Sequence, residues 1–408
     1  MGVLWYLRYS DRIRILGLFF MKKTMEVKPK IESFARIKVL GVGGGGTNAV
    51  NRMIQLGIRG VEFVAINTDA QALHNNAADK KVHIGKTITK GLGSGMNPEV
   101  GRQAAEESAE EIEEVISNAD MVFITCGLGG GTGTGAAPIV AELAKNRGIL
   151  TVAVVTKPFT FEGSKRREVA EMGYANLKDK VDAIISIHND RILQIIDKKT
   201  SLIDSFRTVD DILRQGISGI SDLITSHGVV NADFADVRSI MQDAGTALMG
   251  IGRASGENRA QDAARMAINS PLLELSIDGA QGVLFNITGG SSLGMFEIDE
   301  AAKTITKSID GDARVKFGAV IDEEMGDEIR ITVIATGFDE NNRPSPLTST
   351  PVVEERKVYT PQQAQTPAPE PRVEPRRPQF TPISENTAPS NEPDDELDIP
   401  AFIRRKMK

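Results

Sequence analysis

The sequence predicts an α/β protein with a doubly wound parallel sheet, a long central helix and a smaller C-terminal α/β domain. Three observations support this prediction. Apolar, strand-like segments alternate with helical segments from residue 36 to about residue 200. A helical pattern then continues for about 25 positions from residue 202, which is long for a globular helix. Further strands and helices follow as far as Phe338.

The first half of the chain has the order of βαβ units. Strands are predicted at "RIKVLGV", "EFVAINT", "DMVFITC", "ILTVAVV" and "AIISI". The third and fourth are nearly continuous apolar runs, which is typical of strands buried on both faces of a parallel sheet. Helices are predicted at "TNAVNRMIQL" and over 98–117, where Asn97 is a suitable cap and Pro98 suits the first turn.

The second half predicts a smaller domain of the same class. Strands are expected at "VLFNITG", "RVKFGAVID" and "IRITVIATG", with helices near 260–269 and 297–307. Residues 341–400 then hold thirteen of the eighteen prolines and few apolar residues. Because such a composition cannot bury enough apolar surface to fold, we expect a disordered linker there.

The composition narrows the classes of function. The 408 residues carry a net charge of -7, with an isoelectric point of about 5.4, which argues against nucleic acid as a bulk partner. One cysteine permits no disulfide framework, and the four histidines lack the spacing of metal ligands. We therefore expect a reducing, cytoplasmic setting.

The first 24 residues contain a short apolar run, Ile15–Phe20, and the only tryptophan. The run is far shorter than the ~20 residues of a membrane span and lacks the order of a signal peptide. A weak membrane-surface anchor is one interpretation. A disordered tail, or a translation start at Met21 or Met25, is the interpretation that we favour.

The stretch "VLGVGGGGTNA" has the G-x-G-x-x-G spacing of a dinucleotide-binding turn, at Gly41, Gly43 and Gly46. With Asp69 as a ribose ligand after the second strand, an NAD-dependent oxidoreductase is one possibility. The spacing alone is weak support, because Gly46 also suits close packing of a helix on a strand.

Two further glycine loops favour a ligand with more phosphate groups. The segments "TCGLGGGTGTGAAP" and "GLGSGMNP" each run into a helix N-terminus, where free amides and the helix dipole attract anions. Neither contains the lysine of a P-loop. Three such loops at the carboxyl ends of neighbouring strands suit a triphosphate better than a dinucleotide.

The motif "GGGTGTG" matches the signature of the tubulin/FtsZ superfamily. Together with "GVGGGGTNAVNRM", "AINTDAQAL", "PFTFEGSKR", "GISDLIT", "NADFADVRSIM" and "DIPAFIRR", in the family's order, it makes the chain resemble the bacterial cell-division members from about Ile37 to Phe338. The resemblance implies a polymerising GTPase that binds GTP or GDP and Mg²⁺, the metal being held mainly through the phosphates.

The resemblance also implies which residues bind the phosphates. They are Gly44, Gly45, Gly46, Thr47 and Asn48 in the first loop, Gly93 and Gly95 in the loop over the γ-phosphate, and Gly129, Gly130, Gly131, Thr132, Gly133, Thr134 and Gly135 in the signature loop. The Thr132 and Thr134 hydroxyls are available to help. The chain has Ser94 where alanine is more frequent in the family, a change in a loop that senses the nucleotide.

For the nucleoside, the resemblance implies Glu162 near the ribose, Arg166 near the nucleotide, Asn189 and Asp210 on guanine, and Phe206 stacked on the base. Taken alone, the spacing of Glu162 and Arg166 equally fits an ion pair on a helix surface. A carboxylate that accepts two guanine N–H groups would reject adenine.

The spacing of Asp233 and Asp236 raises a question about catalysis. Two carboxylates on one turn can orient water or hold a cation, but a solvated loop is the simpler interpretation of the pair alone. They lie at the far end of the predicted long helix, roughly 30 Å from the glycine loops if that helix is straight. The resemblance implies that Asn231, Asp233 and Asp236 complete the site of the next subunit, with Ala232 where valine is frequent.

The expected domains are an N-terminal extension (1–35), a GTP-binding domain (36–201), the central helix (202–228), a C-terminal activation domain (229–338), a linker (339–394) and a docking peptide (395–408). In this peptide, Asp398, Ile399, Pro400, Phe402, Ile403 and Arg404 would bind membrane-tethering division proteins such as FtsA, ZipA or SepF, without direct membrane insertion. The resemblance places the protein at the mid-cell division ring. A GTP-dependent scaffold without hydrolysis remains an alternative. Cys126 is expected to be a small buried residue at a strand end.

Overall fold

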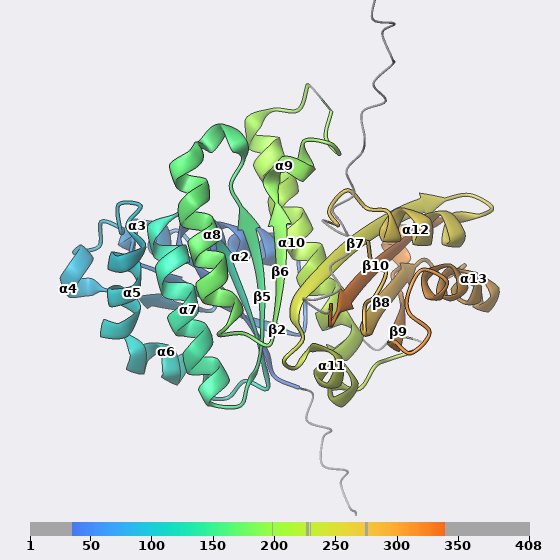
Figure 1. Ribbon diagram of the computed structural model, residues 1–408, viewed down its shortest axis with the longest axis horizontal. Helices are drawn as coiled ribbons and strands as arrows, with labels where there is room; N and C mark the ends of the chain where they lie inside the picture. The colour runs from blue at the N-terminus through green and yellow to red at the C-terminus, as the bar shows by residue number, and fades with distance from the viewer. Residues whose placement is uncertain (1–34, 198, 226–227, 229, 274–275, 339–408) are drawn as a thin grey trace, which may run out of the picture. The chain divides into compact units, whose positions relative to one another are not determined.

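The computed structural model describes residues 35–338 except 198, 226–227, 229 and 274–275 (Figure 1). Ten strands form one sheet in the order β3-β2-β1-β4-β5-β6-β7-β10-β8-β9. The first six are parallel neighbours: β1 (Ile37–Val42), β2 (Val61–Asn67), β3 (Lys80–His83), β4 (Met121–Gly127), β5 (Leu150–Lys157) and β6 (Ala183–His188). This confirms the predicted doubly wound parallel sheet.

Two apolar cores, one on each face, explain why the central strands are apolar at almost every position. Val39 and Phe123 pack into one core with α2 (Gly43–Gln55) and α10 (Leu202–Thr225). Their neighbours Leu40 and Ile124 pack into the other core, and all four side chains are buried. The helices of that second face are α5 (Pro98–Glu107), α6 (Ala109–Ile116), α7 (Gly131–Asn146) and α8 (Ser164–Lys178).

The strand order reverses beside β1, since β2 lies on one side of it and β4 on the other. Both β1 and β4 continue directly into glycine-rich segments and then into α2 and α7. In open α/β sheets, ligands bind in the crevice at such a reversal, outside the carboxyl ends of the strands. The short segments around this edge are α3 (Ala70–His74), α4 (Lys86–Thr89), η1 (Thr160–Glu162) and α9 (Asn189–Ile192).

The predicted long helix is α10, whose 24 residues correspond to about 36 Å. It contacts α2 and β5 in the first half of the chain and β8, β9 and β10 in the second. Its apolar residues face both halves, which explains why the helical pattern is sustained along its whole length.

The C-terminal domain continues the sheet with antiparallel and parallel pairs. Its strands are β7 (Gly245–Ser255), β8 (Gly282–Gly289), β9 (Arg314–Ile321) and β10 (Glu328–Thr336), and its helices are α11 (Phe234–Met241), α12 (Arg259–Ile268), α13 (Met295–Thr306) and the turn η2 (Glu323–Met325). β10 pairs antiparallel with both β7 and β8, and β8 pairs parallel with β9. Within the sheet, the C-terminal domain joins the first half through the pairing of β6 with β7, in which three residue pairs are in register.

Some local predictions differ from the structure. The single helix expected over 98–117 is two helices, interrupted at Ser108, whose hydroxyl accepts a hydrogen bond from the Gly85 amide at 3.3 Å. Asn97 is the predicted cap, since its side chain accepts from the Glu99 amide. The strands β3 and β7 were not predicted, nor were the helices α3, α4, α8, α9 and α11. The expectations for residues 1–34 and 339–408 lie outside the described residues.

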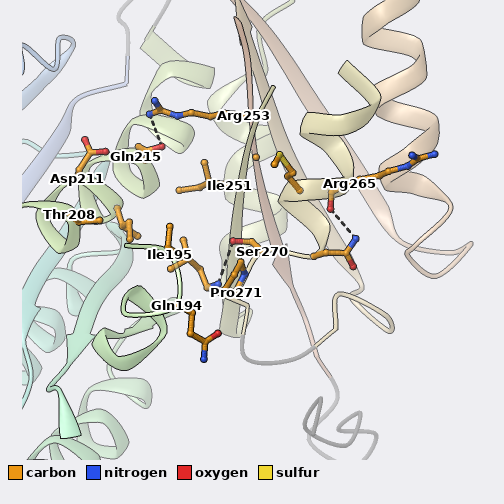
Figure 2. A pocket seen from close by; sticks show the side chains of 15 residues that line it. Gln194, Ile195, Thr208, Asp211, Gln215, Ile251, Arg253, Arg265, Ser270 and Pro271 are labelled. Carbon is orange, nitrogen blue, oxygen red and sulfur yellow. Dashed lines mark hydrogen bonds between the residues drawn. The ribbon is translucent and has the colours of Figure 1, made fainter. Parts of the chain in front are cut away.

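A cavity of about 690 Å³ lies between the first half of α10 and the part of the C-terminal domain formed by β7 and the end of α12 (Figure 2). Thr208, Asp211 and Gln215 of α10 line one side, and Ile251 and Arg253 of β7 line the other. The Arg253 guanidinium donates a hydrogen bond across it to Gln215 Oε1 at 3.2 Å. None of the glycine loops lines this cavity, so it is distinct from the site that the sequence predicts.

Candidate functional site

Two helix N-termini meet backbone to backbone at the carboxyl ends of β1 and β4. A Cβ atom on Gly43, which has φ +70, would lie 2.6 Å from the Gly133 amide nitrogen, and one on Gly45 would lie 3.2 Å from that of Gly127. Only glycine permits this approach. The amides of the first turns of α2 and α7 have no partner within their own helices, so the crevice between them suits an anion.

The remaining phosphate-loop glycines fall into two groups. Side chains on Gly46 and Gly135 would collide with the carbonyl oxygens of Thr125 and Pro98, so these two residues allow α2 to pack closely on β4 and α7 on α5. Gly44 is exposed, and a Cβ atom there would meet nothing within 4 Å. Gly46 therefore has the packing role considered from the sequence, whereas Gly44 faces open space.

The third glycine loop, residues 91–97, lies against the start of α7. A Cβ atom on Gly131 would collide with the Ser94 hydroxyl and approach the Asn97 amide nitrogen to 2.7 Å. Gly93 and Gly95 have φ values of +85 and +57, in the left-handed region that favours glycine. The loop thus reaches the signature loop through backbone conformations that other residues rarely adopt.

A pocket of about 110 Å³ adjoins the glycine loops and brings together six of the predicted site residues. They are Gly45, Glu162, Arg166, Asn189, Phe206 and Asp210. They come from α2, η1, α8, α9 and α10, which are far apart in the sequence. Gly127, Leu128, Thr156, Pro158, Val209 and Leu213 complete the lining.

Two buried polar atoms at this pocket have no hydrogen-bond partner within the described part of the chain. They are Asn189 Oδ1 and Arg166 Nε. Asn189 is 5% exposed, so an unpaired side-chain oxygen there is unfavourable unless a ligand or water supplies a donor. The pair therefore fits a polar ligand that carries both donor and acceptor groups.

Glu162 and Arg166 form the ion pair that their spacing suggests. The Arg166 guanidinium lies 2.9 Å from Glu162 Oε2, and Glu162 Oε1 accepts a hydrogen bond from the Phe159 amide at 2.8 Å. Both side chains also line the pocket. The ion pair therefore stabilises the local structure and also lies at the candidate ligand site.

An aromatic group stands at the pocket edge. Phe206 is 42% exposed, and its ring packs edge-on against Phe159 at a centroid distance of 5.6 Å. Phe159 also stacks on Phe161, with a centroid distance of 4.9 Å. Phe206 is thus fixed by a neighbouring ring while it remains accessible to a flat ligand.

Asp210, one helical turn after Phe206, is the acidic side chain of the pocket that has no ion-pair partner among the described residues. Burial raises the pKa of Asp210 to about 6, while the positive charge of Arg52 on α2 acts in the opposite direction. A carboxylate that is partly deprived of water can recover free energy by accepting hydrogen bonds from a ligand.

The threonine hydroxyls of the phosphate loops already have partners within the protein. Thr47 donates to the Gly43 carbonyl oxygen at 2.9 Å, and Thr134 accepts from the Gly129 amide at 2.9 Å. Thr132 contacts both Thr68 and Ser94. Asn48 is exposed on α2 and Gly130 caps α7. The backbone amides are therefore the more accessible donors of these loops.

Asn231, Asp233 and Asp236 are not part of this pocket. They lie after the opposite end of α10, where Asp233 caps α11 by accepting from the Ala235 amide at 3.3 Å. In Figure 1, α9 and α11 lie near opposite ends of α10. Asp236 pairs with Lys316 at 3.0 Å, and Asn231 Oδ1 accepts from the Gly228 amide at 2.8 Å.

Comparisons with known proteins decide the family. Residues 36–197 match the Tubulin/FtsZ family, GTPase domain, and residues 245–339 match the FtsZ family, C-terminal domain. A structure titled FtsZ dimer, empty, from M. jannaschii, is 44% identical, covers 80% of this chain and 92% of its own, and superposes with a TM-score of 0.72. The chain belongs to the FtsZ family.

Other solved structures agree with this assignment. A point mutant of M. jannaschii FtsZ is 43% identical over 81% of this chain and 96% of its own, with a TM-score of 0.73. The GTPγS-bound protofilament of CetZ2 from Haloferax volcanii is 21% identical over 76% of this chain and 95% of its own, with a TM-score of 0.63, and so shares the fold. As an FtsZ-family protein with a GTPase domain, the chain is a GTPase that binds GTP and GDP.

FtsZ-family membership removes the NAD-dependent oxidoreductase as an interpretation, and the GTPase domain argues against a scaffold without hydrolysis. Asp69 has a structural role instead, because its carboxylate caps α3 by accepting from the Gln71 and Ala72 amides at 2.9 and 3.0 Å. Cys126 is 1% exposed, and burial raises the pKa of its thiol to about 12. This agrees with the expected small buried residue.

Two features of this site were not predicted from the sequence. Arg52 on α2 acts on the charge of Asp210 on α10, and Thr68, directly after β2, contacts Thr132 at the start of α7. Neither had a sequence signal, since both depend on contacts between distant segments. The predicted docking residues 398–404 lie outside the described residues.

Within residues 35–338, apart from the gaps given above, no helix is both long and apolar enough to cross a lipid bilayer. In the same residues, histidine, cysteine and acidic side chains form no group of three or more that could hold a metal ion.

Proposed function

We propose that this protein assembles head to tail into filaments and hydrolyses GTP where one subunit contacts the next. The observation that carries the proposal is the separation of the pocket from Asp233 and Asp236 along α10, a helix of about 36 Å. The two sites cannot meet within one chain. A repeated heterologous contact joins them between chains, and because such a contact does not close, it produces a filament.

Exposed apolar residues around the start of α10, the helix that carries Phe206 and Asp210, support contact with a second copy. Leu193 and Ile195 follow α9, and Leu202 and Ile203 begin α10; these four residues are between 48% and 67% exposed. Clustered exposed apolar residues are typical of interaction surfaces. The dimer of M. jannaschii FtsZ and the protofilament of CetZ2 are assemblies of related chains.

Each part of the proposed GTP site has a role that follows from its chemistry. The amides of the signature loop, Gly129–Gly135, and of Gly44–Asn48 would bind the phosphates, with loop 91–97 over the γ-phosphate. Guanine would stack on Phe206, with its N1 and N2 hydrogens donated to Asp210. Adenine lacks this pair of donors and would leave the carboxylate unpaired.

The acidic loop of the next subunit would complete the site for hydrolysis. Asp233 and Asp236 would orient a water molecule for in-line attack on the γ-phosphate, with Asn231 beside them. When bound, Mg²⁺ would neutralise charge on the phosphates that hold it. The amides at the start of α7 would stabilise the charge that develops in the transition state.

In the cell, we propose that the filaments form the division-site ring in the cytoplasm. Asp398, Ile399, Pro400, Phe402, Ile403 and Arg404 are the residues proposed to bind membrane-tethering partners such as FtsA, ZipA or SepF. A short segment of mixed apolar and basic residues is typical of peptides that fold on a partner.

The test is phosphate release with GTP and Mg²⁺ over a range of protein concentrations, with light scattering recorded in parallel. We expect turnover per molecule to appear above a threshold concentration together with scattering, because each active site needs two subunits. Turnover per molecule that is independent of concentration would place catalysis within one chain and contradict the shared site.

A further inference from the structure

Three hydroxyl groups from separate segments form a chain of hydrogen bonds beside the proposed phosphate site. Thr68 Oγ1, directly after β2, lies 2.7 Å from Thr132 Oγ1 in the first turn of α7. Thr132 Oγ1 lies 2.9 Å from Ser94 Oγ in loop 91–97. The chain thus links a buried strand end to the third glycine loop through the signature loop.

Burial fixes the direction of these hydrogen bonds. Thr68 is fully buried, and Thr132 is the one partner of its hydroxyl among the described residues. A hydroxyl has one proton to donate, and a buried proton without an acceptor is unfavourable. Thr68 therefore donates a hydrogen bond to Thr132, and Thr132 donates its own proton to Ser94. The Ser94 proton is then free for a group outside this chain of hydroxyls.

Ser94 is placed where that group would be an anion. It is partly exposed and lies directly over Gly131, at the N-terminus of α7, where the free amides of the signature loop begin. The left-handed conformations of Gly93 and Gly95 on either side set the course of the loop around it. A donated proton at this position adds to the positive field of the helix N-terminus.

We propose that Ser94 recognises the terminal phosphate of GTP. Its hydroxyl donates to a γ-phosphate oxygen, and Thr68 and Thr132 are positioning residues that orient it. With GDP the same hydroxyl has no phosphate partner, so Ser94 discriminates the triphosphate from the diphosphate. The inference rests on the proposed GTP site, and it assigns to this chain a contact that an alanine at position 94 cannot make.

The test is calorimetric binding of GDP and of the GTP analogue GMPPCP to the full chain, below the assembly threshold. Because a hydrogen bond to a charged group is lost, S94A should weaken GMPPCP binding about tenfold and leave GDP binding within about twofold. S94T keeps the hydroxyl and should restore the preference for the triphosphate. T68V removes the orienting donor while keeping the shape, and should weaken GMPPCP binding selectively but less than S94A.

The outcomes separate the two proposals. If S94A changes the affinities for GMPPCP and GDP equally, or changes neither, the Ser94 contact is overturned while the GTP site stands. If the unmodified protein binds neither nucleotide, the GTP site and the Ser94 contact are both overturned. Circular dichroism of S94A and T68V shows whether each variant is folded, and S94T tests the hydroxyl in a side chain that retains it.

Discussion

Asp210 shows how a single half-buried carboxyl can make ligand binding depend on pH. With its pKa raised to about 6 by burial, the group is mostly ionised at pH 7.5 and mostly protonated at pH 5. A protonated carboxyl cannot accept both guanine hydrogens. We therefore expect GDP affinity to fall about tenfold between pH 7.5 and pH 5, as titration calorimetry would measure.

The variant D210N serves as the control. It should bind GDP about tenfold or more weakly at pH 7.5, because an amide oxygen is a poorer acceptor than a carboxylate, and its affinity should vary little with pH. In the ligand-free protein, the free energy of unfolding depends on pH in the opposite direction. The raised pKa means that Asp210 contributes stability fully below pH 4 and loses it as pH rises through 6. An unchanged pH profile in D210N would exclude Asp210 as the titrating group.

At the scale of elements, the glycines that bring α2 against β4 can be separated from those that face open space. A side chain on Gly46 would collide with the Thr125 carbonyl oxygen, whereas one on Gly44 would meet nothing within 4 Å. We expect G46A to lower the free energy of unfolding by about 1–3 kcal/mol. G44A should stay within about 1 kcal/mol of the unmodified protein.

Urea denaturation without nucleotide measures both variants. G44A is the matched control, because it makes the same chemical change two residues away in the same helix. Equal stability of G44A and G46A would contradict the packing role assigned to Gly46.

Packing of strands against helices also explains why the sequence predicts β4 but not β7. β4 was predicted because nearly every residue is apolar, as burial between two helix layers requires. β7 was not, because Gly250 and Gly252 interrupt its pattern. Side chains there would collide with the Ala267 and Ala263 carbonyl oxygens of α12, so these glycines serve helix packing within a strand. From sequence alone they resemble a turn.

Some parts of the candidate site could be predicted from the sequence, and others could not. The phosphate loops are predictable because glycine runs before helices have a local physical meaning. The base pocket needed the family resemblance, since Asn189 and Asp210 have no local signal that points to a purine. The hydroxyl chain from Thr68 to Ser94 joins segments that meet only after the sheet has formed. Contacts of this kind cannot be predicted from spacing.

At the scale of the whole molecule, a shared active site predicts that two inactive variants restore activity together. D210A impairs the proposed nucleotide site, and D236N impairs the proposed acidic loop. A D236N subunit keeps an intact nucleotide site, and a D210A subunit keeps an intact acidic loop. In a random equal mixture, these two intact parts meet at about one contact in four. We therefore expect roughly a quarter of the unmodified phosphate release from an equal mixture, and little from either variant alone.

Lys316 provides a control for D236N. The variant K316A breaks the surface ion pair with Asp236 but keeps the carboxylate, so its turnover should remain within about twofold, because such exposed pairs contribute little. Co-sedimentation of labelled D210A with D236N shows whether the two form mixed filaments. Mixed filaments without phosphate release would contradict the shared site.

Cys126 has a practical consequence for such measurements. It is the only cysteine of the 408 residues; the residue is 1% exposed, and burial raises the pKa of its thiol to about 12. Maleimides and other thiol reagents need an accessible thiolate, so the native residue resists them at neutral pH. A cysteine introduced at an exposed position would therefore carry a fluorophore at one defined place, without prior removal of the native thiol.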